Sequence, residues 1–360
     1  MQKPASSGNR INKNPTRQRN QRLLAGTFAL LLFFAVFFFS ISVGSVGFSF
    51  TETLKILANT LFGIGDVGDI PDSMVTIILN VRLPRVILAA MVGAALSLSG
   101  AAMQGLLKNP LADGSTLGIT SGGALGAVLS IATGFKLPFL PNGGLVIMSI
   151  LFSFLSLLLI LTLTYKIDYN LSTQTIILTG VIFSMLTGSI TSLIVSLSGN
   201  NLKQVVFWTM GSFSGRGWSH VVLMLPFFMI AAAALLCLSR ELDAFSLGEE
   251  QAEYIGVSTK RVKLLILVLV STLIGVSVAV SGTIGFVGLV IPHITRFITG
   301  PGHKKLLPFS VLFGATFLMA ADLLSRTVLS PAELPIGVVT SLIGALLFIY
   351  IFYSRTRVKE

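Results

Sequence analysis

The sequence predicts an all-α protein that crosses a membrane about ten times. Of its 360 residues, 53% are hydrophobic and only 11% are charged, whereas soluble domains carry about a quarter charged residues. The apolar residues gather in long runs, and a spanning helix needs about 20 of them. Lys and Arg gather in the connections on one side, as they do in cytoplasmic loops. These three observations give the fold class, an all-α polytopic membrane protein.

Ten apolar runs are candidates for the spanning helices. They cover about residues 23–47, 74–107, 114–135, 143–165, 172–198, 218–239, 261–281, 284–299, 305–325 and 334–353. The second run is long and the eighth is short. An even number of spans places both ends of the chain on the same side of the membrane.

The distribution of positive charge predicts that both ends lie in the cytoplasm. In this orientation 18 of the 25 Lys and Arg residues face inward. The seven that face outward are Lys55, Arg82, Arg85, Lys136, Lys203, Arg216 and Arg326. Such an excess is typical of cytoplasmic loops, and nine or eleven spans would remove it. The net charge of +11 therefore reflects topology and not a nucleic-acid partner.

The chain divides into three parts along its length. Residues 1–22 are polar and basic, which predicts a disordered cytoplasmic tail. Residues 23–354 form the ten-helix transmembrane domain, with its main cytoplasmic segment at 240–261, and residues 355–360 form a cytoplasmic C-terminus. The first apolar run is longer than the roughly 7–15 residues of a signal-peptide core, so we expect an uncleaved span.

Several kinds of chemistry are missing from the sequence. Cys237 is the single cysteine, and the three histidines lie far apart without metal-ligand spacing. No G-x-x-x-x-G-K-[ST] motif occurs, so the chain should not bind ATP through a P-loop. A G-x-G-x-x-G match at residues 63–68 lies in an outward loop without a Rossmann context. The sequence therefore predicts a protein that is not an enzyme and that has no cofactor or metal site.

The eighth run is interrupted in a way that a lipid-facing helix does not need. Residues 282–296 read G-T-I-G-F-V-G-L-V-I-P-H-I-T-R. Glycine and proline at membrane depth are tolerated where neighbouring helices or a water-lined path satisfy the freed backbone groups. We interpret this stretch as a broken span of a transport protein, with a translocation or structural role for Gly285, Gly288, Pro292, His293 and Arg296.

A second group of small and polar residues lies at the end of the second run and directly after it. It contains Gly100, Gln104 and the sequence Asn109-Pro110-Leu-Ala. Small residues at this spacing let helices approach closely. Gln104 is a polar group in an apolar stretch and needs a partner, and Asn109-Pro110 predicts a tight inner turn.

The 240–261 segment predicts a short helix outside the membrane. Ser246 and Glu249 have the spacing of a capping box, and Gly256 suits the residue that follows a helix end. Two interpretations are open: a solvated connector, or a docking helix for a cytoplasmic partner. The residues of the docking interpretation are Leu247, Gly248, Glu249, Glu250, Ala252 and Gly256.

Two outward arginines are candidates for a second contact surface. Arg82 and Arg85 bracket a rigid proline, and arginine forks suit carboxylates. They are either interfacial anchors or a clamp for an acidic partner. Arg326 lies four residues after Asp322, on the same helical face, so an internal ion pair and a proton relay are both open for Asp322.

These motifs together resemble the FecCD-type permeases of bacterial ABC importers for iron chelates and cobalamin. The resemblance covers about residues 75–350 and rests on the order R-L-P-R, G-x-x-x-Q with N-P-L-A, W-x-x-G-S, L-G-x-x-x-A-x-x-x-G, G-T-I-G-F-V-G-L-x-x-P-H-x-x-R, A-D-x-x-x-R and E-L-P-I-G. It implies a type II importer permease in the bacterial cell membrane. The implied partners are a second permease subunit, ATP-hydrolysing subunits and an extracellular or periplasmic binding protein.

The resemblance also implies roles for the motifs. The 246–256 pattern resembles the segment that meets the ATPase subunit, and Arg82, Arg85 and Arg326 match arginines that pair with the binding protein. The implied function is import of an iron(III)-siderophore, or of cobalamin or haem, by alternating access. The alternative is an ion-coupled secondary transporter that uses Asp322 and His293. The sequence shows no obvious pair of broken helices in two repeat halves, which argues against this alternative.

Overall fold

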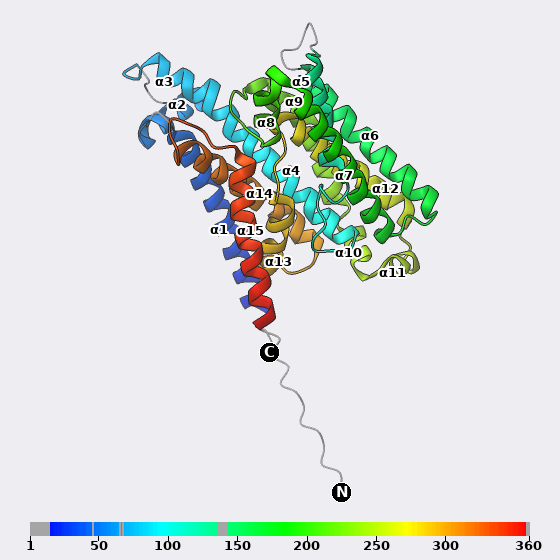
Figure 1. Ribbon diagram of the computed structural model, residues 1–360. Helices are drawn as coiled ribbons and strands as arrows, with labels where there is room; N and C mark the ends of the chain where they lie inside the picture. The colour runs from blue at the N-terminus through cyan, green and yellow to red at the C-terminus, as the bar shows by residue number, and fades with distance from the viewer. Residues whose placement is uncertain (1–14, 45–46, 65, 67, 136–142, 358–360) are drawn as a thin grey trace.

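The computed structural model describes residues 15–357 except 45–46, 65, 67 and 136–142. The described part is built from helices and their connections (Figure 1). The elements are α1 (Pro15–Ser42), α2 (Phe50–Phe62), α3 (Asp72–Thr76), the π-helical η1 (Ile77–Arg82), α4 (Leu83–Leu106), α5 (Ile119–Thr133), α6 (Gly143–Ile167), α7 (Thr173–Leu197), the short η2 (Gly199–Asn201), α8 (Leu202–Thr209), α9 (Trp218–Cys237), α10 (Ser239–Leu247), α11 (Glu249–Tyr254), α12 (Thr259–Ser281), α13 (Val287–Thr299), α14 (His303–Thr327) and α15 (Ile336–Arg357).

Ten apolar helices match the ten predicted spans. Six are long and apolar enough to cross a membrane by length and composition: the continuous helix 72–106 that ends with α4, and α6, α7, α9, α12 and α14. The four shorter ones lie in α1, α5, α13 and α15. The prediction of an all-α membrane protein with about ten spans is confirmed.

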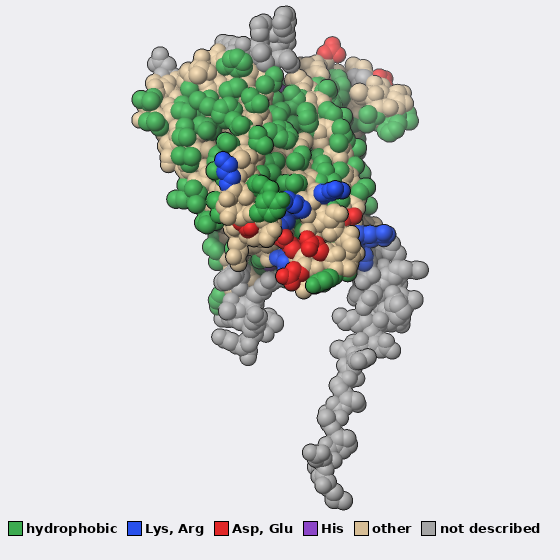
Figure 2. All heavy atoms as spheres, turned by 90° about the vertical axis from the view of Figure 1, so that its right-hand side faces the viewer, with side chains coloured by type: hydrophobic (Ala, Val, Ile, Leu, Met, Phe, Trp, Pro, Cys, Tyr) green, Lys and Arg blue, Asp and Glu red, His purple; other side chains and the backbone are tan. Residues whose placement is uncertain are grey.

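The two ends of the molecule differ in what they carry. The start of α1 and the end of α15 lie at the same end as α10 and α11, whereas α2 and α3 lie at the opposite end (Figure 1). Seen from the side, apolar side chains are spread over much of the surface, and charged side chains gather near the end that carries α10 and α11 (Figure 2). This arrangement agrees with cytoplasmic N- and C-termini, and we call the two ends inner and outer.

The first helix begins earlier than the sequence predicted. Residues 15–22, which we expected in the disordered tail, continue α1 toward the N-terminus as helix. Glutamine and arginine are good helix formers, so the apolar helix extends through them. The rest of the predicted tail, residues 1–14, lies outside the described residues.

Helix α4 is the central element, and its neighbours touch it through glycines. It packs against α9, α12, α13 and α14 and is buried along most of its length. A Cβ atom on Gly93 would lie 2.2 Å from the carbonyl oxygen of Gly314, and one on Gly100 would lie 1.8 Å from that of Gly288. The small residues therefore set the distance between these helices, as predicted.

Two short helices begin at mid-height of the molecule. Ser115, in the connection before α5, accepts a hydrogen bond on its carbonyl oxygen from Ser184, which lies in the middle of α7. Helix α13 begins beside the inner half of α4, where Gly288 meets Gly100. Each of these two helices follows a non-helical segment, residues 107–118 before α5 and residues 282–286 before α13.

Candidate functional site

The inner segment, residues 239–254, consists of two helices and not one. Helix α10 ends at Leu247, and α11 begins at Glu249. Gly248 joins them with φ +135° and ψ 155°, a conformation that glycine adopts most easily. The predicted capping box was wrong: Ser246 lies inside α10 and donates to the carbonyl oxygen of Leu242. Gly256 does follow the end of α11, with φ +91°.

Ion pairing fixes α11 to the membrane domain. The Glu249 carboxylate lies 2.6 Å from the Lys263 ammonium on α12 and accepts a hydrogen bond from Thr173 at the start of α7. Lys263 is buried and also donates to the carbonyl oxygen of Leu171. The position of α11 relative to α7 and α12 is therefore set by charged and polar contacts.

The face of the inner segment that points away from the membrane domain is exposed. Leu247 is 66% exposed, Ile255 64% and Tyr254 90%. Glu250 is exposed as well, whereas Ala252 is buried against the domain. Ala252 therefore faces the membrane domain, whereas Leu247 and Ile255 are exposed. An exposed apolar group beside the exposed carboxylate of Glu250 has the composition of a contact surface for another protein.

An open cavity of about 810 Å³, which we call the central cavity, lies between the non-helical segments before α5 and α13 and the start of α15. Its walls come from the connection before α5, the segment before α13, the start of α13, the loop after α8 and the start of α15. Asp113 is the one charged residue among those lining it. The other lining side chains are apolar or carry hydroxyl groups, so the cavity offers hydrogen-bonding groups but no basic side chain.

Three of the sequence motifs meet at the outer end of this cavity. The Ser212 N–H donates to the carbonyl oxygen of Ser281, and the Gly337 N–H donates to that of Met210. A Cβ atom on Gly282 would lie 2.3 Å from the carbonyl oxygen of Trp208. The W-x-x-G-S, G-T-I-G and L-P-I-G motifs thus form one junction that is held mainly by backbone contacts.

Gln104 has the partner that its position required. Its Nε2 donates to the carbonyl oxygens of Gly288 and Leu289 at 3.3 and 3.1 Å. These bonds tie the inner half of α4 to the first turn of α13. Asn109 accepts the Leu111 N–H on its side chain, which confirms the tight turn before Asp113.

The remaining residues of the broken span lie on α13. Pro292 and His293 are buried, and the His293 ring packs against Phe297 and Phe348. Arg296 lines a second, inner cavity of about 510 Å³ together with Lys108 and Asp243. Gly285 lines the central cavity. Residues of this segment therefore line both the central cavity and the inner cavity.

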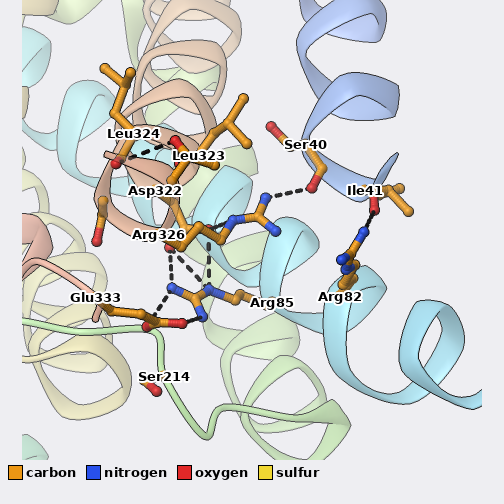
Figure 3. A network of polar contacts seen from close by, with 12 residues as sticks. Ser40, Ile41, Arg82, Arg85, Ser214, Asp322, Leu323, Leu324, Arg326 and Glu333 are labelled. Carbon is orange, nitrogen blue, oxygen red and sulfur yellow. Dashed lines mark hydrogen bonds and ion pairs between the residues drawn. The ribbon is translucent and has the colours of Figure 1, made fainter. Parts of the chain in front are cut away.

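Arg82, Arg85 and Arg326 are buried and engaged within the chain (Figure 3). Arg82 donates to the carbonyl oxygens of Ile41 and Ser42 at 2.9 and 2.7 Å, at the end of α1. Arg326 donates to the carbonyl oxygen of Ser40 and lies 3.4 Å from Asp322. The predicted internal pair between Asp322 and Arg326 is therefore present.

Arg85 forms the centre of this network. It binds Asp322 at 2.9 Å and Glu333 at 2.9 Å, and so links α4 to α14 and to the loop before α15. Burial alone would raise the pKa of Glu333, but the hydrogen bonds and charge of Arg85 hold that pKa below its usual value of 4.5. No sequence pattern indicated the contact between Arg85 and Glu333, because the two residues are far apart along the chain.

Within the described residues no three His, Cys, Asp or Glu side chains lie close enough together to hold a metal ion. The features that the structure brings together are instead a central cavity, an inner contact surface and an outer charged network. Of the predicted residues, Gly285 and Gly288 line the central cavity, and Gln104 bonds to the helix turn beside it. Arg82, Arg85 and Arg326 lie apart from it, at the outer end.

The chain is similar to known membrane permeases over most of its length. Residues 31–354 match the model of the FecCD transport family. The ABC transporter permease protein YvrB of Bacillus subtilis (strain 168) is 45% identical over 341 residues, which are 95% of this chain and 96% of YvrB. The hemin transport system permease protein HmuU of Yersinia pestis is 38% identical, over 93% of this chain and 96% of HmuU.

A solved structure has the same fold. A metal-chelate type ABC transporter in an inward-facing conformation superimposes with a TM-score of 0.80 and 35% sequence identity, over 91% of this chain and 98% of that one.

Proposed function

Because the chain belongs to the FecCD transport family of ABC permeases, we propose that it is the membrane subunit of an importer for an iron(III)-siderophore or a related chelate such as haem or cobalamin. The observation that carries the proposal is the match over residues 31–354, which includes both the inner segment and the walls of the central cavity. Import takes place by alternating access, in the cell membrane of a bacterium, and ATP is hydrolysed in a separate subunit.

The inner segment is the docking site for that ATPase subunit. Its exposed Leu247, Tyr254 and Ile255 offer apolar contacts, and Glu250 offers a charge. The Glu249–Lys263 pair anchors α11 to α12, so a force applied to α11 reaches a membrane helix directly. The hinge at Gly248 allows α11 to keep its own angle to α10.

The central cavity is part of the substrate path. One chain provides an open cavity of about 810 Å³, and a second permease subunit would close the path between the two copies. The lining contains hydroxyl groups, apolar side chains and one carboxylate, and therefore holds a bulky chelate weakly. Weak binding suits a path from which the substrate must leave, whereas a binding protein supplies the affinity.

The outer network is the docking end for that binding protein. Arg82 and Arg326 are bound to the end of α1, so they hold the outer surface in shape. Arg85 is paired with Glu333, whose side chain is 35% exposed. In this docking, a carboxylate of the binding protein would replace Glu333 as the partner of the buried Arg85 guanidinium. The exchange would release the loop before α15, and Arg85 would then act as the predicted clamp.

The secondary-transporter alternative finds less support. Asp322 is buried between Arg85 and Arg326, so its charge is already compensated. His293 packs among aromatic rings and not beside the Asp322 carboxylate.

The test is to isolate the native complex in mild detergent and identify its subunits by mass spectrometry. An ATPase with a P-loop and a substrate-binding protein would support the proposal, and the ligand of that binding protein would name the substrate. A chain that purifies alone and remains active in vesicles with only an ion gradient would contradict it.

A further inference from the structure

Arg216 lies in the loop between α8 and α9, at the outer end of the molecule. Its Nη1 donates a hydrogen bond to Nε2 of His220 at 3.2 Å, so this ring nitrogen carries no proton and the imidazole is neutral. The Nε of Arg216 is buried without a hydrogen-bond partner. Its Nη2 has no partner among the described residues either, and it is not fully buried. Most of the five N–H donors of this guanidinium are therefore unused.

No carboxylate of the described residues lies within ion-pair distance of Arg216. The described residues include every acidic side chain of the chain except Glu360, which belongs to the predicted cytoplasmic C-terminus. Burial lowers the pKa of Arg216 below its usual value, and no acidic group opposes this effect. A partly buried charge without a partner is costly, so its presence in a folded protein needs an explanation.

The loop that carries Arg216 is fixed on both sides of this residue. The Arg216 N–H donates to the carbonyl oxygen of the buried Phe213 and closes a turn. The indole of Trp218 donates to the carbonyl oxygen of Leu79 in η1 at 2.9 Å. The loop is thus ordered before any partner binds, which lowers the entropic cost of binding.

This loop adjoins the outer network of charged residues. Ser214, two residues before Arg216, lies beside Glu333, which is bound to Arg85 (Figure 3). Each arginine of that network already has a partner, either a carboxylate or backbone carbonyl oxygens. Arg216 therefore adds to the outer end a guanidinium whose charge is still uncompensated.

We propose that Arg216 binds a carboxylate of the extracellular binding protein when that protein docks on the outer end. A planar guanidinium suits a carboxylate, and Nη2 carries the N–H groups that a docked carboxylate reaches. The contact would compensate the charge that has no acidic partner within the chain. Arg216 lies outside the R-L-P-R and A-D-x-x-x-R motifs, so the resemblance gives it no role. The inference rests on the proposed function and adds a residue to its docking end.

The experiment measures how tightly the native permease–ATPase complex in nanodiscs captures the binding protein. The probe is the ligand-loaded binding protein that co-purifies with the complex. Arg216→Gln removes the charge, whereas Arg216→Lys keeps the charge without the planar fork. Lys203→Gln is the matched control, because it removes an exposed positive charge on α8, directly before the same loop.

We expect Arg216→Gln to raise the dissociation constant about 30-fold or more, as the loss of one partner of a desolvated charge pair does. Arg216→Lys should recover part of the affinity, and Lys203→Gln should leave it nearly unchanged. The unfolding temperature of the Arg216→Gln complex should not fall, because the variant removes a charge without an acidic partner in the chain. An arginine with only a structural role would show the reverse, a lower unfolding temperature with normal capture.

Three results would overturn the inference. They are unchanged capture with Arg216→Gln, an equal loss of capture with Lys203→Gln, and a lower unfolding temperature with capture intact. An effect of Arg216→Gln on stability that occurs only in nanodiscs of anionic lipid would also overturn it and assign the partner to a lipid phosphate. Loss of the second permease subunit from the complex would overturn it as well and assign the carboxylate to that subunit.

The proposed function and this inference fail in different ways. A complex that contains no binding protein contradicts the proposed function, and this inference with it. A complex whose binding protein is captured independently of Arg216 contradicts this inference alone.

Discussion

Glu249 and Lys263 form an ion pair of 2.6 Å between the inner segment and α12, and only the glutamate is partly exposed. The side chain of Lys263 is 2% exposed and that of Glu249 is 35% exposed. The pair therefore fixes α11 to α12, whereas the neighbouring Glu250 is exposed to solvent. The two glutamates, which are adjacent in sequence, have separable roles.

Glu250→Lys should abolish the association with the ATPase subunit at an unchanged level of the permease. The exposed carboxylate has no structural partner that would be lost, and the reversed charge opposes docking. Co-purification with the ATPase subunit and uptake measure the effect. Asp69→Lys, a reversal at an exposed acidic residue of the outer end, is the control and should leave association intact. Full association of Glu250→Lys would contradict the docking role.

Glu249→Ala should lower the stability of the permease itself. It leaves the buried ammonium of Lys263 with only the carbonyl oxygen of Leu171, and removal of one partner of a buried pair costs about 3–5 kcal/mol, less here since Glu249 is partly exposed. Lys263→Met with Glu249→Ala should recover much of the loss. Thermal unfolding in detergent measures it, and a double variant less stable than Glu249→Ala would refute the assignment.

Arg85→Glu should destabilise the outer end strongly, because the new carboxylate would face both Asp322 and Glu333. The combination with Glu333→Arg should restore part of the stability by re-forming the pair in reverse. The loss is expected at about 3–5 kcal/mol. If Arg85→Glu weakened capture of the binding protein without lowering the unfolding temperature, Arg85 would be a docking residue only.

Acid should loosen the loop before α15. The pKa of Glu333 is lowered in the folded protein, so its contribution to stability is complete above its ordinary pKa of 4.5 and is lost as the pH falls through the lower, folded value. Thermal unfolding between pH 7 and strongly acidic pH should show this loss only in the acidic range. Glu333→Gln should be less stable at neutral pH and should lack this part of the acid transition.

Gly100→Ala should disrupt the packing of α4 on α13. The added methyl group would meet the carbonyl oxygen of Gly288, and overpacking of a core costs typically about 1–3 kcal/mol or more where backbone is struck. Gly188→Ala on α7 is the matched control. No atom lies within 4 Å of its Cβ position, and alanine favours helix by about 1 kcal/mol over glycine. Equal unfolding temperatures for the two variants would contradict the packing role.

The sequence predicted those features that depend on neighbours along the chain. Long apolar runs predicted all ten apolar helices, and the spacing of four residues predicted the contact between Asp322 and Arg326. It could not predict the Arg85–Glu333 pair, because nothing near either residue indicates how α4 and the loop before α15 approach each other.

Local sequence patterns also gave wrong predictions where the surrounding helix determined the hydrogen bonding. Ser246 and Glu249 have the spacing of a capping box, but α10 already covers Ser246, so its hydroxyl bonds within the helix. The same spacing at Ser49 and Glu52 does form a capping box at the start of α2. The left-handed backbone of Phe286, with a φ of +68°, could not be predicted either, because an aromatic residue is ordinary in an apolar run.

Helix α4 is bonded to neighbouring elements at both of its ends. Arg85 fastens it to the outer loop and Gln104 fastens it to the start of α13. The helix has 24 residues, so at 1.5 Å per residue it is a rod about 36 Å long that hardly compresses along its axis. If docking at the outer surface shifts Arg85, such a helix would carry the shift along its axis to the broken span, with no relay of small side-chain movements in between.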